Sequence, residues 1–127
     1  MGVRAIVRDA QGHVLLVRHT YVPGWYLPGG GVDSGESAGE SLARELMEEA
    51  NIRIAQAPRL IGLYFNPRGG NDHVALYEVT CFEQISAKQP DREIAEARFF
   101  PPDALPENTT PATRARLLGE VNESGRW

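Results

Sequence analysis

Residues 30–52 of the chain read GGVDSGESAGESLARELMEEANI and carry the signals for the start and the end of one helix. Ser37 and Glu40 have the spacing of a capping box, in which each side chain accepts a hydrogen bond from the backbone N–H of the other residue. Asn51 tolerates the left-handed conformation that ends a helix. Apolar residues recur every four positions between these signals and form one apolar side, namely Ala38, Leu42, Leu46 and Ala50. The segment therefore predicts an amphipathic helix that begins after Ser37 and ends at Asn51.

The same helix carries a concentration of carboxylates. At about 100° per residue, Glu45, Glu48 and Glu49 project within an arc of about 100° and should face the same place. Like charges at these spacings destabilise a helix by roughly 0.2–0.5 kcal/mol per pair. A divalent cation would reverse the sign of that interaction, and carboxylate oxygens are ligands that Mg²⁺ and Mn²⁺ prefer. These three residues therefore predict a metal site.

The alternative is a solvated helix face, on which Arg44 pairs with Glu40 and Glu48 four residues away on either side. Most charge runs are of this kind. Glu49, however, projects beside Leu42 on the helical wheel, so at least one carboxylate borders the buried side, where an unpaired charge is costly. This position favours the metal site.

The segments around the helix predict strands and a loop. Residues 3–8 and 13–19 are apolar runs joined by turn residues, a pattern typical of a β-hairpin. Residues 20–31 contain prolines and end in three consecutive glycines, which predicts a loop whose backbone approaches a ligand closely. Residues 59–65 and 72–82 predict a second hairpin.

The last third of the sequence predicts less regular structure. Residues 84–92 are polar and are expected to be irregular, residues 97–100 predict a short strand, and residues 110–121 predict a helix with Pro111 near its start. Hairpins combined with two helices predict a single α/β domain over residues 1–127, with a mixed β-sheet between helices.

Composition excludes several classes of protein. The 127 residues have a net charge of -4 and no run of basic residues, so we expect no DNA partner. The apolar runs are too short to span a bilayer, so we expect no membrane partner. Cys81 is the only cysteine, and the first residues lack the pattern of a secretion signal. We therefore expect a cytoplasmic protein.

The pattern from Gly30 to Ile52 resembles the box of the Nudix hydrolases, the family of MutT-like pyrophosphohydrolases: G-x5-E-x7-R-E-U-x-E-E-x-G-U, where U is apolar. Every defined position agrees except Asn51, where the family usually has glycine, and because asparagine is the next most tolerant residue, the helix should still end there. The flanking segments 25–30 and 93–100 resemble the family as well.

This resemblance implies a Nudix-type α/β/α sandwich that hydrolyses a nucleoside diphosphate linked to another group, with Mg²⁺, for which Mn²⁺ can substitute. The metal ligands that it implies are Glu45, Glu48, Glu49 and the Gly29 carbonyl. Gly30 and Glu36 would be accessory positions of the box. Arg44 would orient Glu48 and Glu49 by charge-assisted hydrogen bonds.

The general base stays open between two alternatives, because family members differ in its position. One is a glutamate of the box, such as Glu49, and the other is Glu93, which precedes the predicted strand 97–100. A solvated carboxylate in an acidic patch with Asp91 and Glu96 explains Glu93 equally well.

Candidates for substrate binding lie outside the box. Arg18 is a candidate for a phosphate contact, although arginines at strand ends are often solvated. Tyr64 and Phe65, like Trp25 and Tyr26, are candidates for stacking on a nucleobase, with packing in the core as the alternative.

The resemblance leaves the substrate open. Pro67, fifteen residues after Ile52, resembles a proline marker of ADP-ribose-hydrolysing members, although turn chemistry explains it too. We therefore rank ADP-ribose or a nucleoside diphosphate sugar first, ahead of nucleoside triphosphates, dinucleoside polyphosphates and capped RNA ends. A non-catalytic nucleotide-sensing domain is the competing hypothesis, but such domains commonly lose box glutamates, and all are present here. The expected partner is a small nucleotide, and monomer and homodimer both stay open.

Overall fold

The computed structural model of the chain describes residues 1–69, 72–119 and 125–127. Its strands are β1 (Gly2–Val7), β2 (Val14–His19), β3 (Trp25–Tyr26), β4 (Gly29–Gly31), β5 (Ile52–Ile54), β6 (Arg59–Asn66), β7 (Asp72–Val79), β8 (Phe82–Gln84) and β9 (Ile94–Phe100). The helices are α1 (Ala38–Ala50), α2 (Pro111–Leu117) and the 3₁₀ turn η1 (Pro67–Gly69).

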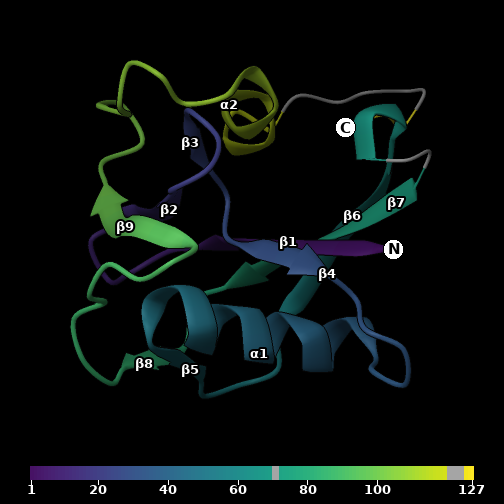
Figure 1. Ribbon diagram of the computed structural model, residues 1–127, viewed down its shortest axis with the longest axis horizontal. Coiled ribbons are helices and arrows are strands. Elements are labelled where there is room, and N and C mark those ends of the chain that lie inside the picture. Colours follow the sequence, from purple (N-terminus) through teal and green to yellow (C-terminus); the bar gives the residue numbers. More distant parts are fainter. Residues whose placement is uncertain (70–71, 120–124) are drawn as a thin grey trace.

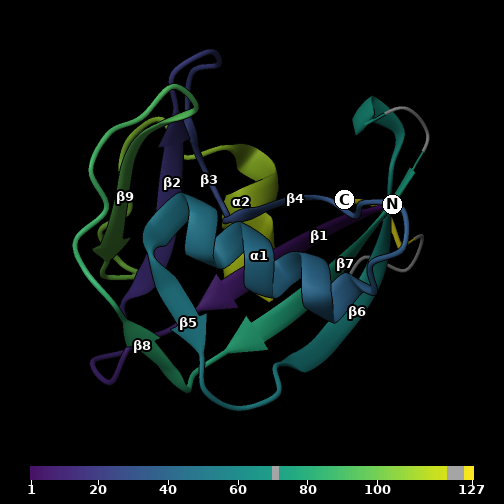
Figure 2. The same cartoon turned by 60° about the horizontal axis from the view of Figure 1, so that its bottom comes forward.

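The strands form a mixed central layer with one helix on each side (Figures 1 and 2). One sheet has the order β4-β1-β7-β6, a second has the order β3-β2-β9, and β5 pairs with β8. In the first sheet β1 is parallel to β7 and antiparallel to β4. The α/β/α sandwich with a mixed sheet is therefore confirmed.

The core consists of two buried clusters on opposite sides of β1. Val3, Ala5 and Val7 pack with Leu42 and Leu46 of α1. Ile6 belongs to the other cluster, which lies on the α2 side and includes these buried residues: Val14, Leu16, Trp25, Leu27, Leu76 and Phe100. Because α1 is anchored in the first cluster, the carboxylates on its flank have a defined position relative to β4.

Helix α1 forms as predicted. Ser37 Oγ accepts a hydrogen bond from Glu40 N at 3.1 Å, and Glu40 Oε1 accepts one from Ser37 N at 2.9 Å. Asn51 ends the helix in the left-handed region, with φ 54° and ψ 38°. Both ends are thus set by local hydrogen bonds and backbone conformation.

The predicted N-terminal hairpin is wrong, because β1 and β2 enter different sheets. The turn after β1 closes through a hydrogen bond from Gly12 N to Asp9 O at 3.0 Å, but beyond it Arg8 and Val14 form only an isolated bridge. β1 is buried on both faces and lies between β4 and β7, whereas β2 lies between β3 and β9. A strand with two buried faces needs a neighbour on each edge, and turn chemistry does not say which strands those are.

Several predicted boundaries also differ. The predicted loop 20–31 contains β3 and β4, because the glycines of β4 pair with β1 along an extended backbone. The second hairpin forms from β6 and β7, but β7 ends at Val79, and Phe82 begins β8. Strand β9 begins at Ile94, earlier than predicted.

The second helix is shorter than predicted where the structure describes it. α2 begins after the N-cap Thr110, with Pro111 in its first turn, and ends at Leu117, while part of the predicted span 110–121 lies outside the described residues. Within the described part of the chain, neither α1 nor α2 has the length and apolar character needed to cross a membrane.

Candidate active site

Glu49 projects inward from α1 toward the glycine strand β4. Its carboxylate Oε1 accepts a hydrogen bond from Gly29 N at 2.8 Å, and its Oε2 lies 3.7 Å from Nε2 of His19. The residue is only 6% exposed. A carboxylate that is held this far from water by a backbone N–H and an imidazole is positioned for chemistry rather than for solubility.

Glu45 is the second inward carboxylate, with 14% of its side chain exposed. Burial raises the pKa of the Glu45 carboxyl, and the charge of Glu49 raises it further, whereas the hydrogen bond from Arg44 lowers it. Two carboxylates thus repel each other in a region of low solvent access. Carboxylate oxygens that repel each other fit a hard divalent cation, which would remove the repulsion.

Glycines allow β4 to approach these carboxylates. A Cβ at Gly30 would lie 2.6 Å from Glu45 Oε1, and Gly29 has φ +144° with its ideal Cβ position 2.0 Å from Val3 O. Any side chain at either position would displace the carboxylate or break the contact with β1. The glycines form a strand and not the predicted loop, and they bring the backbone close to Glu45 and to β1. Their predicted approach to a ligand stays a prediction.

Arg44 forms hydrogen bonds with carboxylates and with one backbone carbonyl of the box. Its guanidinium donates to Glu36 at 3.0 Å and to Glu45 Oε1 at 2.9 Å, and Nη2 donates to Gly31 O at 3.2 Å. The hydrogen bonds that Arg44 and the Ser41 hydroxyl donate to Glu36 lower the pKa of its carboxyl to about 2. Glu36 is therefore a charged anchor for Arg44.

The prediction that Arg44 orients both Glu48 and Glu49 is wrong for Glu49. Arg44 reaches Glu48 only at 3.5 Å, and Glu49 is held by Gly29 and His19 instead. Five residues along a helix correspond to about 500°, so Glu49 projects roughly 140° away from Arg44. The resemblance implied a contact that the geometry of the helix does not favour.

The three box glutamates do not all face one place. Glu48 is directed to solvent, with 56% of its side chain exposed, whereas Glu45 and Glu49 point inward. Within residues 1–69, 72–119 and 125–127, no three His, Cys, Asp or Glu side chains are assembled around one point that fits a metal ion. Glu48 as a third metal ligand therefore stays a prediction.

The backbone of Glu93 lies near the site, whereas its side chain points to solvent. Thr20 N donates to Glu93 O at 2.9 Å, next to His19, which pairs with Ile94 in the β2–β9 ladder. The Glu93 side chain is exposed. Its role as a base stays a prediction.

The predicted substrate residues are packed against other side chains. Arg18 Nη2 lies 3.4 Å from Glu96 Oε1, and its guanidinium carbon lies 5.8 Å from the centroid of the buried Trp25 ring. Tyr64 meets Trp127 edge to face, with ring centroids 5.7 Å apart, and Phe65 contacts His73. These contacts leave their predicted roles in binding untested.

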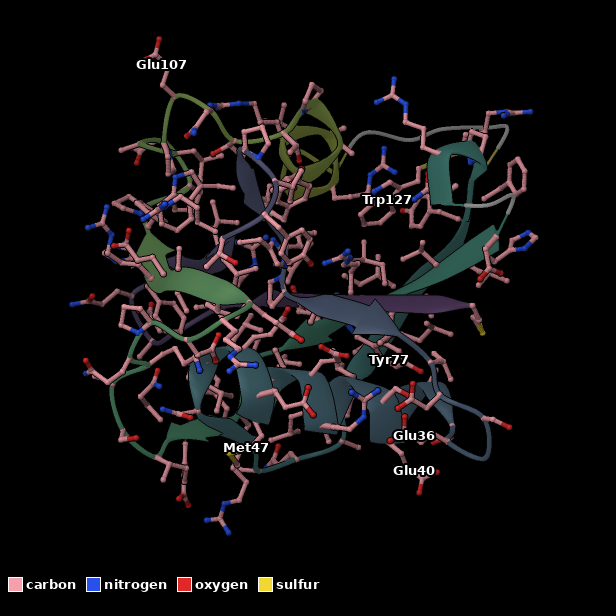
Figure 3. All side chains as sticks on the ribbon, viewed as in Figure 1. Glu36, Glu40, Met47, Tyr77, Glu107 and Trp127 are labelled. Carbon is pink, nitrogen blue, oxygen red and sulfur yellow. The ribbon has the colours of Figure 1, made fainter. Side chains whose placement is uncertain are left out.

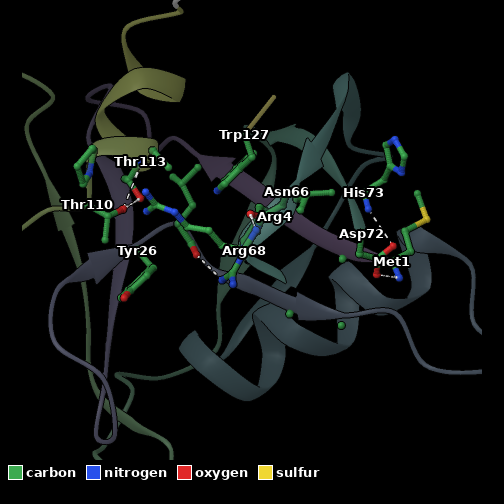
Figure 4. A pocket seen from close by; sticks show the side chains of 17 residues that line it. Met1, Arg4, Tyr26, Asn66, Arg68, Asp72, His73, Thr110, Thr113 and Trp127 are labelled. Carbon is green, nitrogen blue, oxygen red and sulfur yellow. Dashed lines mark hydrogen bonds and ion pairs between the residues drawn. The ribbon is translucent and has the colours of Figure 1, made fainter. Parts of the chain in front are cut away.

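A pocket of about 530 Å³ opens on the other side of β4 (Figure 4). Gly30 and Gly31 form part of its wall, and Arg4, Arg68 and Trp127 line it. In Figure 4 these three side chains lie toward the middle, with Tyr26 and Thr110 at one end and Asp72 and His73 at the other. The pocket and the inward carboxylates thus share the glycine strand.

Sequence reasoning did not identify His19 or Trp127 as parts of the site. His19 ends an apolar strand, and Trp127 lies 75 residues after the box ends at Ile52. No local motif marks either residue, because each reaches the site only through tertiary contacts.

Comparison with known proteins agrees with this geometry. The model of the NUDIX domain matches residues 1–119. A protein of Bacillus subtilis (strain 168) named "Putative 8-oxo-dGTP diphosphatase" is 32% identical over 117 residues, which cover 91% of this chain and 76% of that protein. An RNA pyrophosphohydrolase of Shewanella piezotolerans is 43% identical over 51 residues, which cover 40% of this chain and 30% of that protein.

Solved structures show the same fold. The crystal structure of a MutT NUDIX hydrolase from Burkholderia pseudomallei superposes with a TM-score of 0.70 and 26% identity, covering 91% of this chain and 96% of that one. The family match spans almost the whole chain, and the glutamates, the arginine and the first glycine of its box, Gly30, lie in the site described above. The chain belongs to the Nudix family and is a pyrophosphohydrolase, an enzyme that cleaves acid anhydrides.

Proposed function

We propose that the chain hydrolyses the diphosphate linkage of a nucleotide with Mg²⁺ or Mn²⁺ bound at Glu45, Glu49 and Glu48. The observation that carries this proposal is the pair of inward carboxylates, Glu45 and Glu49, which lie against the glycines of β4. The bound cation would neutralise the phosphates and activate water.

The other residues hold this pair in place. Gly29 N and His19 orient Glu49, while Arg44 orients Glu45 and is itself anchored by Glu36. Charge-assisted hydrogen bonds of this kind fix carboxylate geometry better than neutral ones. We propose Glu49 as the general base ahead of Glu93, because Glu49 is buried and oriented, whereas the Glu93 side chain is exposed.

For the substrate we propose a nucleoside triphosphate ahead of ADP-ribose or a nucleoside diphosphate sugar. The Bacillus subtilis relative, which aligns over most of both chains, is named for a nucleoside triphosphate. The pocket volume of about 530 Å³ suits one nucleoside, and Arg4 and Arg68 supply positive charge for phosphates.

The test is hydrolysis of a panel of anhydrides with Mg²⁺, with Mn²⁺ and with EDTA. The panel contains the common nucleoside triphosphates, 8-oxo-dGTP, ADP-ribose, a UDP-sugar and a 5′-triphosphorylated RNA. We expect metal-dependent release of pyrophosphate or a nucleoside monophosphate, fastest with a triphosphate. Glu49→Gln and Glu45→Gln should each lower kcat by at least about 100-fold. Glu107→Gln should not, because Glu107 is exposed, lies away from α1 on the α2 side (Figure 3) and is not part of the pocket wall.

Two outcomes would contradict the proposal. Tight binding of nucleotides without turnover across the panel would identify a nucleotide sensor. Turnover that is unchanged in Glu49→Gln but lost in Glu93→Gln would place the base outside the box.

A further inference from the structure

Trp127 is held at the pocket by its backbone. Phe65 N donates to Gly125 O at 2.7 Å, and Trp127 N donates to Phe65 O at 2.8 Å, so residues 125–127 lie along the outer edge of β6. Figure 3 shows Trp127 on the α2 side of the sheets, while Glu36 lies on the α1 side. The short segment 125–127 thereby places an indole in the wall of the pocket.

Arg116 of α2 fixes this segment from the other side. The arginine is buried, 7% exposed, and its Nη1 donates to the carbonyls of Arg126 and Trp127 at 3.2 and 3.0 Å. Its guanidinium carbon lies 4.6 Å from the centroid of the Tyr64 ring and 5.1 Å from that of Trp127. Burying a guanidinium is costly unless other groups replace water. Here two backbone oxygens accept from Nη1 and two aromatic rings face the guanidinium, whereas Nε has no hydrogen-bond partner among the described residues.

Tyr64 supports Trp127 and does not itself line the pocket. Its ring meets the indole at 74°, with centroids 5.7 Å apart, on the side of the second core cluster. The indole is thus supported from behind by Tyr64 and Arg116 while it contributes to the pocket wall. A rigidly supported aromatic surface at a cavity is suited to stacking on a flat ring.

The remaining wall of the pocket supplies the complementary chemistry. Arg4 and Arg68 are cationic, and Asp72 is neutralised by an ion pair with the amino group of Met1. Gly30 and Gly31 lead from the pocket to the inward carboxylates. One cavity therefore offers an aromatic surface, positive charge and an approach to the proposed metal site.

We propose that Trp127 is the stacking surface for the nucleobase of the substrate, so that residues 125–127 select nucleotides over phosphoanhydrides that have no base. The inference rests on the proposed function for the identity of the ligand. Tyr64 and Arg116 are positioning residues in this arrangement, because they act through Trp127.

The sequence offers a direct probe, because Trp25 and Trp127 are its only two tryptophans. In a Trp25→Phe variant, Trp127 is the sole source of indole fluorescence. With Mg²⁺ present, the α,β-methylene analogues of ATP and GTP should quench this fluorescence, since their bridging carbon prevents cleavage at that bond. Methylenediphosphonate, which has no base, should leave it unchanged.

Affinity measurements separate stacking from a structural role. Trp127→Ala should weaken binding of at least one of the two analogues by roughly 5- to 100-fold, Trp127→Phe should restore most of it, and the affinity for methylenediphosphonate should stay the same in both. Leu63→Ala is the matched control. Leu63 is 54% exposed on β6, the strand along which residues 125–127 lie, and it is outside the pocket wall. Thermal unfolding of each variant checks the fold.

The inference is overturned if Trp127→Ala binds both analogues like the wild type, or if it loses affinity for the base-free probe to the same extent. These results are independent of turnover. Base-dependent quenching without hydrolysis of any anhydride would contradict the proposed function and support the stacking role. Hydrolysis without base-dependent quenching would support the proposed function and contradict the stacking role.

Discussion

His19 Nε2 lies 3.7 Å from Glu49 Oε2, and this contact joins the end of β2 to the last turn of α1. The β2–β9 ladder shifts register between Arg18 and His19. Irregularities of this kind commonly re-aim a side chain beside an active site. The imidazole is 9% exposed and is enclosed by Tyr21 and Tyr26, with ring centroids 5.3 and 5.4 Å away. Glu49 therefore meets polar groups from two directions: it accepts a hydrogen bond from Gly29 N, and His19 Nε2 lies nearby, beyond hydrogen-bond distance.

The first prediction concerns this contact. His19→Phe keeps an aromatic ring but removes the nitrogen that faces Glu49, so the carboxylate loses one of its two polar contacts. We expect metal affinity or kcat to fall by about 10- to 100-fold, as for other residues that orient a metal ligand. Mn²⁺ titration followed by electron paramagnetic resonance measures affinity without turnover. His13→Phe, in the turn after β1, is the control, and equal Mn²⁺ affinity in the two variants would disprove the orienting role.

The second prediction concerns Gly30. A Cβ at this position would lie 2.6 Å from Glu45 Oε1, and the flexible carboxylate can move aside more easily than the backbone. We therefore expect Gly30→Ala to fold normally but to lose at least about tenfold in Mn²⁺ affinity. Gly39→Ala tests the effect of a methyl group on α1 itself, because the nearest heavy atom to its Cβ is 4.0 Å away. Normal metal binding by Gly30→Ala would show that the Glu45 position is unimportant.

The third prediction concerns the anchoring of α1. Leu46 is fully buried between the helix and β1, and Leu46→Ala should lower the free energy of unfolding by about 2–5 kcal/mol through lost burial and a cavity. Leu118→Ala, at a position that is 75% exposed, should change it by less than about 0.5 kcal/mol. Urea unfolding followed by circular dichroism compares the two. Similar losses for both variants would contradict the described core.

The fourth prediction concerns stability in acid. Asp91 pairs with Lys88 and accepts hydrogen bonds from Glu93 N and Ile94 N at 2.9 and 2.7 Å, and these contacts lower its pKa from 3.8 to about 2. A carboxyl whose pKa is lowered by folding stabilises the protein above its unfolded pKa, and the effect is lost as pH falls from about 4 to about 2.

The measurement is the urea midpoint at pH 5, 4, 3 and 2. The wild type should lose stability over this range more steeply than Asp91→Asn, which has no carboxyl to protonate. Asp103→Asn, at an exposed position outside this loop, should follow the wild type. Parallel curves for wild type and Asp91→Asn would show that the loop contacts do not contribute.

Local signals predicted the box helix well. The Ser37–Glu40 capping box, the apolar spacing through Leu46 and the left-handed Asn51 each depend on residues within one or two turns of one another. Such interactions form in the same way whatever surrounds the helix. The predicted hairpin of β6 and β7 formed for a related reason, since its strands are joined by a short segment rich in turn residues.

Local sequence signals did not predict which strands pair or which side chains point inward. The turn between β1 and β2 forms as expected, yet the two strands diverge because β1 is buried on both faces and takes β4 and β7 as neighbours. Glu48 and Glu49 are adjacent in sequence, but one is exposed and the other buried. Helical periodicity gives their relative directions, and only the packing of α1 against β4 decides which direction is inside.

The amino-acid sequence by itself therefore determined the family, the box helix and the cluster of acidic side chains that we propose to bind the metal, because these are written in short-range spacing. Tertiary structure alone decided that His19 and Gly29 hold Glu49 and that Trp127 reaches the pocket. Gly29 and His19 lie 20 and 30 positions from Glu49, and Trp127 lies 62 positions from Phe65. Their contacts depend on which strands share a sheet, a choice made by burial of the whole core and not by neighbouring residues.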